Sequence, residues 1–123
     1  MRLQESGEMY LETIYILSQK KSDVHSIDVA AEMNYSKPSV SRAVNLLKDN
    51  DYLNIDNSGR ITLTDAGLEV AERIYERHQL ISDILITLGV DQKTATADAC
   101  RIEHVISKDS FAKVKEWYAK HKK

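Results

Sequence analysis

The sequence predicts a mainly α-helical protein in two parts, a mixed N-terminal part and an all-helical C-terminal part. Apolar residues recur at helical spacing through most of the chain. One pair of short alternating segments interrupts this pattern near the middle of the chain. One proline and four glycines among 123 residues leave few places where helices must break.

Composition excludes several classes of protein. Hydrophobic residues make up 42% and charged residues 29% of the chain, which excludes a disordered tail. No apolar run approaches the roughly 18 residues that cross a bilayer, and residues 1–6 lack the apolar core of a secretory signal. The lone Cys100 suits a reducing compartment, so we expect a cytoplasmic protein. The net charge of −2 means that any nucleic-acid binding uses a local basic surface.

Three helices are predicted in the N-terminal part. Residues 6–20 carry apolar side chains at helical spacing, and Ser26 is placed to cap a second, short helix. Residues 34–36 are typical of a tight turn, after which Pro38 lies in the first turn of a third helix. The apolar stripe of this third helix consists of Val40, Ala43, Val44 and Leu47.

A β-hairpin is predicted next. Segments 53–55 and 60–63 alternate in polarity, and between them Asn57 and Gly59 suit the positive φ of a tight turn. The order helix, helix-turn-helix, hairpin is that of a winged helix-turn-helix. We therefore assign residues 1–64 to a DNA-binding domain, with the pattern itself spanning about residues 6–64.

The remaining residues, 65–123, are predicted to form an all-helical domain. Thr64 is placed to cap a long helix that runs to Gly89, Asp91 caps a helix to about Ser107, and a short amphipathic helix follows. The long helix has more apolar side chains than a small domain need bury, which indicates dimerisation. Its stripe consists of Val70, Ala71, Ile74, His78, Ile81, Leu85 and Leu88.

The third helix and the hairpin carry the residues that we expect to contact DNA. Small hydroxyls and free N–H groups at a helix start suit phosphate oxygens, and Arg42 can bond guanine with two parallel hydrogen bonds. Lys37 and Arg60 are expected on flanking phosphates. Each of these residues alone could be a helix cap or a solvated charge, but the whole arrangement favours DNA. The predicted DNA-binding residues are Ser36, Lys37, Pro38, Ser39, Ser41, Arg42 and Arg60.

One segment of the C-terminal part has the composition of a metal site. Cys100, Glu103 and His104 stand at positions i, i+3 and i+4, which places a thiolate, a carboxylate and an imidazole on one helix face. The alternative is an exposed Glu–His pair beside a small buried cysteine.

Two other places could add ligands to such a site. His78 interrupts an apolar stripe, where a histidine is more often a core residue than a ligand. Met9 and Glu12, three residues apart on the first helix, bring a thioether and a carboxylate together. Only convergence of these residues in space would make a site, and spacing along the chain does not show it.

Four segments together resemble the metal-dependent repressors typified by the diphtheria toxin repressor and the manganese transport regulator. The resemblance implies a homodimer joined through residues 65–123, which binds a palindromic operator in double-stranded DNA and represses genes of iron or manganese homeostasis. It also implies a metal ion that bridges the first helix and the helical domain. The matching segments are Glu8-Met9-Tyr10-Leu11-Glu12-Thr13-Ile14-Tyr15, Ser36-Lys37-Pro38-Ser39-Val40-Ser41, Leu63-Thr64-Asp65-Ala66-Gly67 and Asp98-Ala99-Cys100-Arg101-Ile102-Glu103-His104-Val105-Ile106-Ser107.

The resemblance also assigns the metal ligands, in two overlapping sets. Met9 and Cys100, with Glu103 and His104, match the iron-responsive branch. Glu12 and His78, with the same Glu103 and His104, match the manganese branch. That branch, however, has an aspartate in place of Met9 and a glutamate in place of Cys100.

The ancillary site of the iron branch is expected to be incomplete. Ser82 and Thr96 stand where that branch has an acidic residue and a histidine, unless Asp83 or Glu12 substitutes. The chain is also expected to lack the SH3-like third domain of longer iron repressors.

A mixed sulfur, nitrogen and oxygen site favours Fe(II), with Mn(II) second. The metal would act as a clip that stabilises the DNA-binding conformation. Three alternatives stay open: a winged-helix regulator that does not respond to metal, a small metalloenzyme built on Cys100, Glu103 and His104, and a protein-interaction module. Against an enzyme, no separate general base or glycine-rich substrate loop accompanies those residues.

Overall fold

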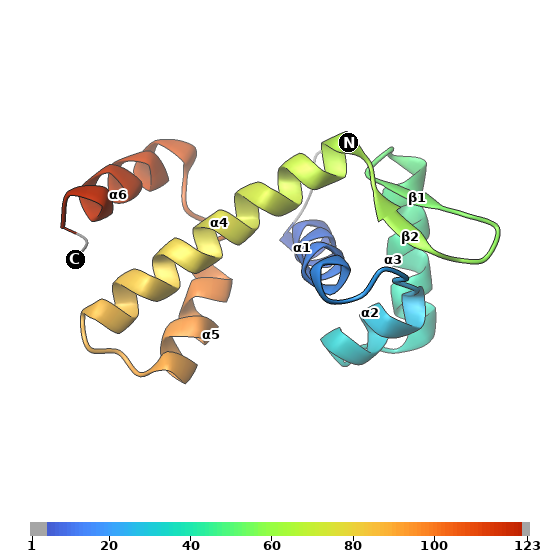
Figure 1. Ribbon diagram of the computed structural model, residues 1–123, viewed down its shortest axis with the longest axis horizontal. Coiled ribbons are helices and arrows are strands. Elements are labelled where there is room, and N and C mark those ends of the chain that lie inside the picture. The colour runs from blue at the N-terminus through green and yellow to red at the C-terminus, as the bar shows by residue number, and fades with distance from the viewer. Residues whose placement is uncertain (1–4, 122–123) are drawn as a thin grey trace. The chain divides into compact units, whose positions relative to one another are not determined.

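The computed structural model describes residues 5–121, which fold into helices and one hairpin (Figure 1). The chain divides between Arg73 and Ile74 into two compact units. The domain boundary expected at residues 64 and 65 stays a prediction. The elements are α1 (Glu5–Lys20), α2 (Ser26–Met33), α3 (Lys37–Asp49), β1 (Leu53–Ile55), β2 (Ile61–Leu63), α4 (Asp65–Thr87), α5 (Gln92–Ile102) and α6 (Lys108–His121).

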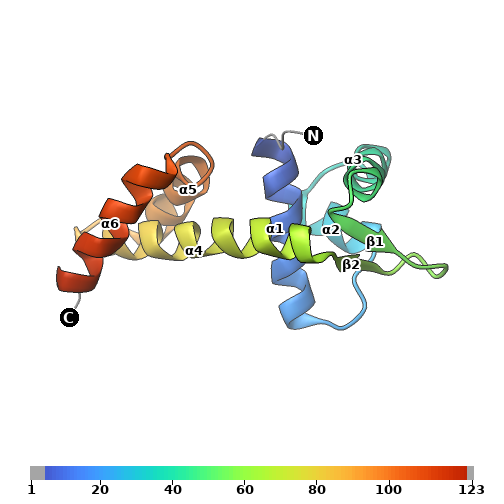
Figure 2. The same ribbon diagram turned by 90° about the horizontal axis from the view of Figure 1, so that it is seen from above.

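The first unit is the predicted winged helix-turn-helix (Figures 1 and 2). Strands β1 and β2 pair antiparallel, with Leu53 opposite Leu63 and Ile55 opposite Ile61. The Ile61 N–H also donates to the Val24 carbonyl at 2.7 Å, which ties the hairpin to the loop between α1 and α2. The core consists of Tyr10, Leu11, Ile14, Leu17, Val24, Val29, Ala30, Val40, Val44, Leu47, Leu53, Ile61 and Ala71.

Two of the three predicted helix caps, Thr64 and Asp91, are confirmed, and Ser36 caps α3. Ser36, Thr64 and Asp91 each accept a hydrogen bond from the backbone N–H three residues later, at 3.3, 3.1 and 3.1 Å respectively. The prediction of Ser26 as a cap is wrong, because Ser26 is already the first residue of α2 and His25 precedes it as the cap. The Asp28 carboxylate accepts from the His25 N–H at 2.8 Å and thereby fixes this start.

The second unit begins within α4 and continues through α5 and α6. Its core consists of Ile81, Ala99 and Phe111 with partly buried apolar neighbours. The expectation that the fifth helix reaches about Ser107 is wrong, because α5 ends at Ile102. The buried Arg77 of α4 donates to the carbonyls of Glu103 at 3.1 Å and Ile106 at 2.7 Å, so these carbonyls bond a side chain instead of continuing a helix.

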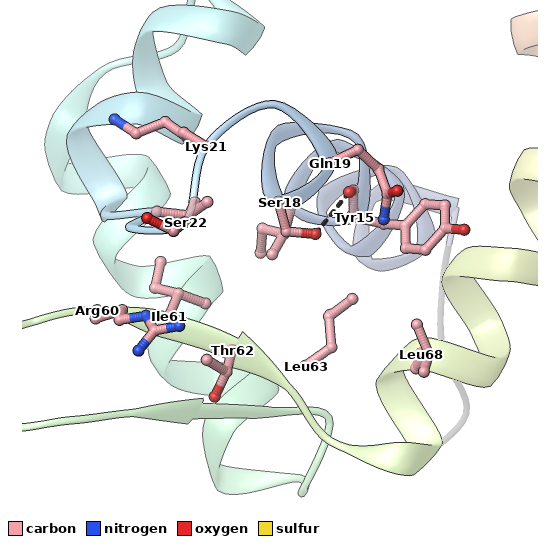
Figure 3. Close-up of a pocket in the computed structure, with 12 residues that line it drawn as sticks. Tyr15, Ser18, Gln19, Lys21, Ser22, Arg60, Ile61, Thr62, Leu63 and Leu68 are labelled. Atoms are coloured by element: carbon pink, nitrogen blue, oxygen red, sulfur yellow. Dashed lines mark hydrogen bonds between the residues drawn. The ribbon is translucent and has the colours of Figure 1, made fainter.

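A cavity of about 260 Å³ lies within the first unit, between α1, the loop after it, β2 and the start of α4 (Figure 3). Its walls mix apolar side chains such as Ile14, Ile61 and Leu63 with polar ones, and Arg60 stands at one side. The Ser18 hydroxyl donates to the Tyr15 carbonyl at 2.7 Å, a hydrogen bond within α1. Among residues 5–121, no helix combines the length and apolar character that a membrane crossing needs.

We predict that Gly67→Ala destabilises the first unit severely. Gly67 is buried in the first turn of α4, and a Cβ atom there would lie 2.1 Å from the backbone carbonyl oxygen of Tyr52. Because that oxygen also accepts from the Thr64 N–H at 3.2 Å, it cannot simply move away. Overpacking of this kind costs roughly 1–3 kcal/mol or more. Thermal unfolding followed by circular dichroism measures the loss. The exposed neighbour Ala66 provides the control, because Ala66→Ser should unfold within about a degree of the parent chain; equal melting of the two variants would contradict the prediction.

Candidate nucleic-acid interface and metal centre

The start of α3 forms a connected polar surface. Ser36 caps the helix, and its hydroxyl donates to Ser39 Oγ at 2.8 Å. Arg42 Nη2 reaches the same Ser39 oxygen at 3.4 Å. The opposite face of the helix carries the buried Val40, Val44 and Leu47. The core therefore orients α3 so that Ser36, Lys37, Pro38, Ser41 and Arg42 are exposed and Ser39 is half-buried, as expected of a surface that contacts DNA.

An aromatic pair, which the sequence analysis missed, adjoins this surface. Tyr35 directly precedes the Ser36 cap and remains 48% exposed. Its ring contacts the buried Tyr10 ring of α1 edge-on, with centroids 6.1 Å apart and planes at 63°. Burial, then the nearby Tyr35, raises the pKa of Tyr10, whereas the charge of Arg42 lowers it. Tyr10, Tyr35 and Arg42 are thus electrostatic neighbours. The signal available in the sequence was an aromatic residue in an otherwise polar turn.

The hairpin tip is organised around Asp56. Its carboxylate accepts from the Ser58 hydroxyl at 2.7 Å and from the N–H groups of Ser58 and Arg60, both at 2.9 Å. The Ser58 hydroxyl bond, followed by the Arg60 N–H bond, lowers the pKa of Asp56. The Arg60 guanidinium, with Nε 4.0 Å from Asp23 Oδ1, is about half exposed. Arg60 therefore lies on a well-ordered hairpin with its charge accessible.

Three of the six predicted metal ligands meet in the second unit. The Glu103 side chain is fully buried, and its Oε2 lies 2.8 Å from His78 Nδ1. Its Oε1 lies 3.2 Å from His104 Nε2, in an imidazole that is also buried. A carboxylate flanked by two imidazoles is a nitrogen and oxygen donor set that suits divalent transition metals. The donor chemistry of this cluster therefore fits the metal that the sequence implies.

Neither unit, taken by itself, brings the other three predicted ligands, Met9, Glu12 and Cys100, into this cluster. Cys100 is half-buried in the last turn of α5, three residues before Glu103. Met9 and Glu12 lie on α1 in the first unit, where Glu12 is buried. Their participation stays a prediction.

The positions predicted for an ancillary site differ in exposure. Ser82 is buried on α4, Thr96 is exposed on α5, and Asp83 is exposed. The prediction that this site is incomplete stays a prediction.

Arg77 holds the turn that carries Glu103 and His104, and the sequence analysis missed it. It is 5% exposed and bonds the Glu103 and Ile106 carbonyls, while its guanidinium lies 5.3 Å from the centroid of the Phe111 ring. These contacts fix the backbone on which Glu103 and His104 stand. The available signal was its spacing with Ile74 and Ile81, which places Arg77 on the buried stripe of α4.

We predict that Arg42→Ala makes DNA binding weaker and less dependent on salt. Loss of a phosphate contact by a cation lowers the slope of log affinity against log salt by about one, and loss of a guanine contact lowers the affinity for the preferred sequence. Fluorescence anisotropy of a labelled duplex between 50 and 200 mM salt measures both quantities. Lys93→Ala removes an exposed charge from the second unit and serves as control. Parent-like affinity together with an unchanged slope for Arg42→Ala would show that Arg42 does not contact DNA.

We predict that Arg77→Lys destabilises the second unit and weakens metal binding together. A lysine lacks the planar fork that serves two carbonyls at once, and a buried carbonyl left unpaired costs about 1–3 kcal/mol. Thermal melts and calorimetric metal titration provide the two measurements. Arg101, which is exposed and pairs with Asp98 on the surface, gives the matched control Arg101→Lys, for which little change is expected. If Arg77→Lys bound metal with the affinity of the parent chain, Arg77 would have no role in metal binding.

Comparison with known proteins matches almost the whole chain to one family. Residues 2–59 match the N-terminal DNA-binding domain of the iron-dependent repressors, and residues 64–123 match their metal-binding and dimerisation domain. An uncharacterised HTH-type transcriptional regulator of Methanocaldococcus jannaschii is 31% identical over 122 residues, which cover 98% of each chain. The HTH-type transcriptional regulator MntR of Shouchella clausii is 33% identical over 109 residues, covering 89% of this chain and 76% of that protein.

Solved structures share the same fold. The manganese regulator SloR superposes with a TM-score of 0.82 at 27% identity, over 97% of this chain and 55% of that one. IdeR of T. acidophilum superposes with a TM-score of 0.81 at 22% identity, over 97% and 56% respectively, a likeness of fold. The chain thus spans about half the length of these two structures.

Proposed function

The chain belongs to the iron-dependent repressor family of metal-dependent, DNA-binding transcriptional repressors, and we propose that a divalent metal ion held by Glu103, His78 and His104 switches on its binding to an operator. The observation that carries this proposal is the fully buried Glu103 carboxylate between two imidazoles. Burying a carboxylate is costly unless partners compensate its charge, and a divalent cation supplies two opposite charges. Metal binding would therefore strongly stabilise the conformation in which these donors are close together.

We propose that Met9, Glu12 and Cys100 complete the metal site. Met9 and Glu12 stand on α1 in the first unit, whereas the cluster around Glu103 belongs to the second. A metal that binds donors from both units would favour a defined arrangement of the DNA-binding unit. Shifting a conformational equilibrium from 1% to 99% needs about 5.5 kcal/mol of differential binding, and two sites in a dimer could share it.

The proposed assembly is a homodimer joined through residues 65–123 that binds a palindromic operator. Exposed apolar side chains in the second unit support this assembly, because a monomer would leave them in water. They are Ile86, Leu88, Val105 and Trp117, with exposures of 43, 70, 73 and 49%. A regulator of this kind acts on DNA in the cytoplasm and has no catalytic role.

For the physiological metal we propose Fe(II), with Mn(II) second. The Cys100 thiolate and the Met9 thioether are softer ligands than Mn(II) prefers, and they suit Fe(II) better. The carboxylate and imidazole donors suit both ions, and one solved relative is named as a manganese regulator. Mn(II) is therefore the second candidate.

The direct test measures DNA binding in chelator, in Fe(II) and in Mn(II). A labelled duplex selected from a random library serves as the operator, under anaerobic conditions. We expect tight binding with metal, and at least 100-fold weaker binding in chelator. Equal binding in chelator would retain the DNA-binding function and overturn the metal switch.

Cys100→Ser tests the choice of metal. Because a hydroxyl is a poorer ligand for Fe(II) than a thiolate, we expect the variant to lose roughly tenfold more response to Fe(II) than to Mn(II). The same anisotropy titration supplies the numbers. Ser110→Ala, an exposed position in α6 outside the ligand set, is the control, and its responses to both ions should match those of the parent chain. Equal losses for both metals in Cys100→Ser would contradict a selective thiolate.

A further inference from the structure

We propose that Tyr35 is a further DNA-contacting residue, whose hydroxyl donates to an operator phosphate, and that the ring of Tyr10 holds it in position. This inference rests on the proposed function and extends its DNA-binding surface. It also connects that surface to α1, the helix that carries Met9 and Glu12.

The backbone of Tyr35 is fixed at the edge of the DNA-binding surface. Asn34 adopts a left-handed conformation with φ 58°, and the Tyr35 N–H donates to the Ala30 carbonyl at 3.1 Å to close α2. The next residue, Ser36, caps α3. Tyr35 is thus locked directly before the helix start that faces DNA, where side chains of the turn reach the phosphate backbone.

The side chain of Tyr35 is held on one side and open on the other. Its ring packs edge-on against Tyr10, which is only 6% exposed, while 48% of Tyr35 remains accessible. A single exposed aromatic residue is common on protein surfaces, and what distinguishes Tyr35 is its place directly before the cap of α3 and its ring contact with Tyr10. Tyrosine is also among the uncharged side chains that bond phosphate oxygens, and it has only two side-chain rotations to lose.

Tyr10 connects this contact to the rest of α1. It follows Met9 directly and lies two residues before Glu12, so any rotation or shift of α1 moves the Tyr10 ring. Because that ring supports Tyr35, such a movement changes where the Tyr35 hydroxyl points. Tyr10 is therefore a positioning residue, and Tyr35 is the residue that touches DNA.

The experiment compares Tyr35→Phe, Tyr10→Leu, Tyr10→Phe and the double variant Tyr10→Leu/Tyr35→Phe with the parent chain. Anisotropy of the selected duplex is measured with saturating Mn(II) at several salt concentrations, and thermal melts are recorded in parallel. Tyr118→Phe, which removes a tyrosine hydroxyl from α6, is the matched control.

Tyr35→Phe is expected to bind about tenfold more weakly with an unchanged melting temperature. Its salt slope should equal that of the parent, because a neutral donor releases no counterion. Tyr10→Leu should lose a similar factor, Tyr10→Phe should not, and the double variant should lose no more than either single variant, since both act on one contact.

If the parent chain binds DNA in a metal-dependent way and Tyr35→Phe binds equally tightly, this inference is overturned while the proposed function stands. Losses that add fully in the double variant overturn the role of Tyr10. A parent chain that binds no duplex with metal overturns the proposed function and this inference together.

Discussion

The second unit depends on the burial of one carboxylate. Glu103 has no exposed side-chain surface, and each of its oxygens lies within 3.2 Å of an imidazole nitrogen, from His78 or His104. Its backbone is held by Arg77, which lies over Phe111 and so joins α4, the α5–α6 turn and α6. A buried charge is tolerated only where charge and hydrogen bonds compensate it. The same contacts that make this core possible also bring together donors that suit a divalent cation, so under the proposed function one set of residues would serve both stability and metal binding.

In the first unit, the start of α3 is polar and exposed, while the rest of the helix contributes to the core. The buried stripe of Val40, Val44 and Leu47 fixes the rotation of α3. The Ser36 cap satisfies an N–H group at its start, and the bond from Ile61 to Val24 holds the hairpin beside the helices. The exposed hydroxyls and Arg42 are therefore presented on a packed scaffold, which would lower the entropic cost of the DNA contacts proposed for them.

Most of the fold followed from local patterns. Helical spacing, the hairpin and the caps at Thr64 and Asp91 are properties of short segments, and the structure confirms them. In the hairpin turn Gly59 has the expected positive φ, whereas Asn57 does not. The predicted fifth helix was too long because the contact that ends it comes from Arg77, 26 residues away from Glu103. Likewise, His78 and Glu103 could be proposed as ligands from their residue types, but only the fold brings them within 2.8 Å. Arg77 and Tyr35 were missed because each acts through a tertiary contact, with Phe111 and with Tyr10.

The central claim is that a divalent cation binds at the buried Glu103 carboxylate. The most direct measurement is an anomalous difference map from crystals of the full chain grown with Mn(II). We expect the strongest peak to lie at coordination distance from a Glu103 oxygen and at least one of the imidazoles of His78 and His104. A map with no peak there, with Glu103 still in place between the two imidazoles and manganese bound elsewhere, would contradict the account.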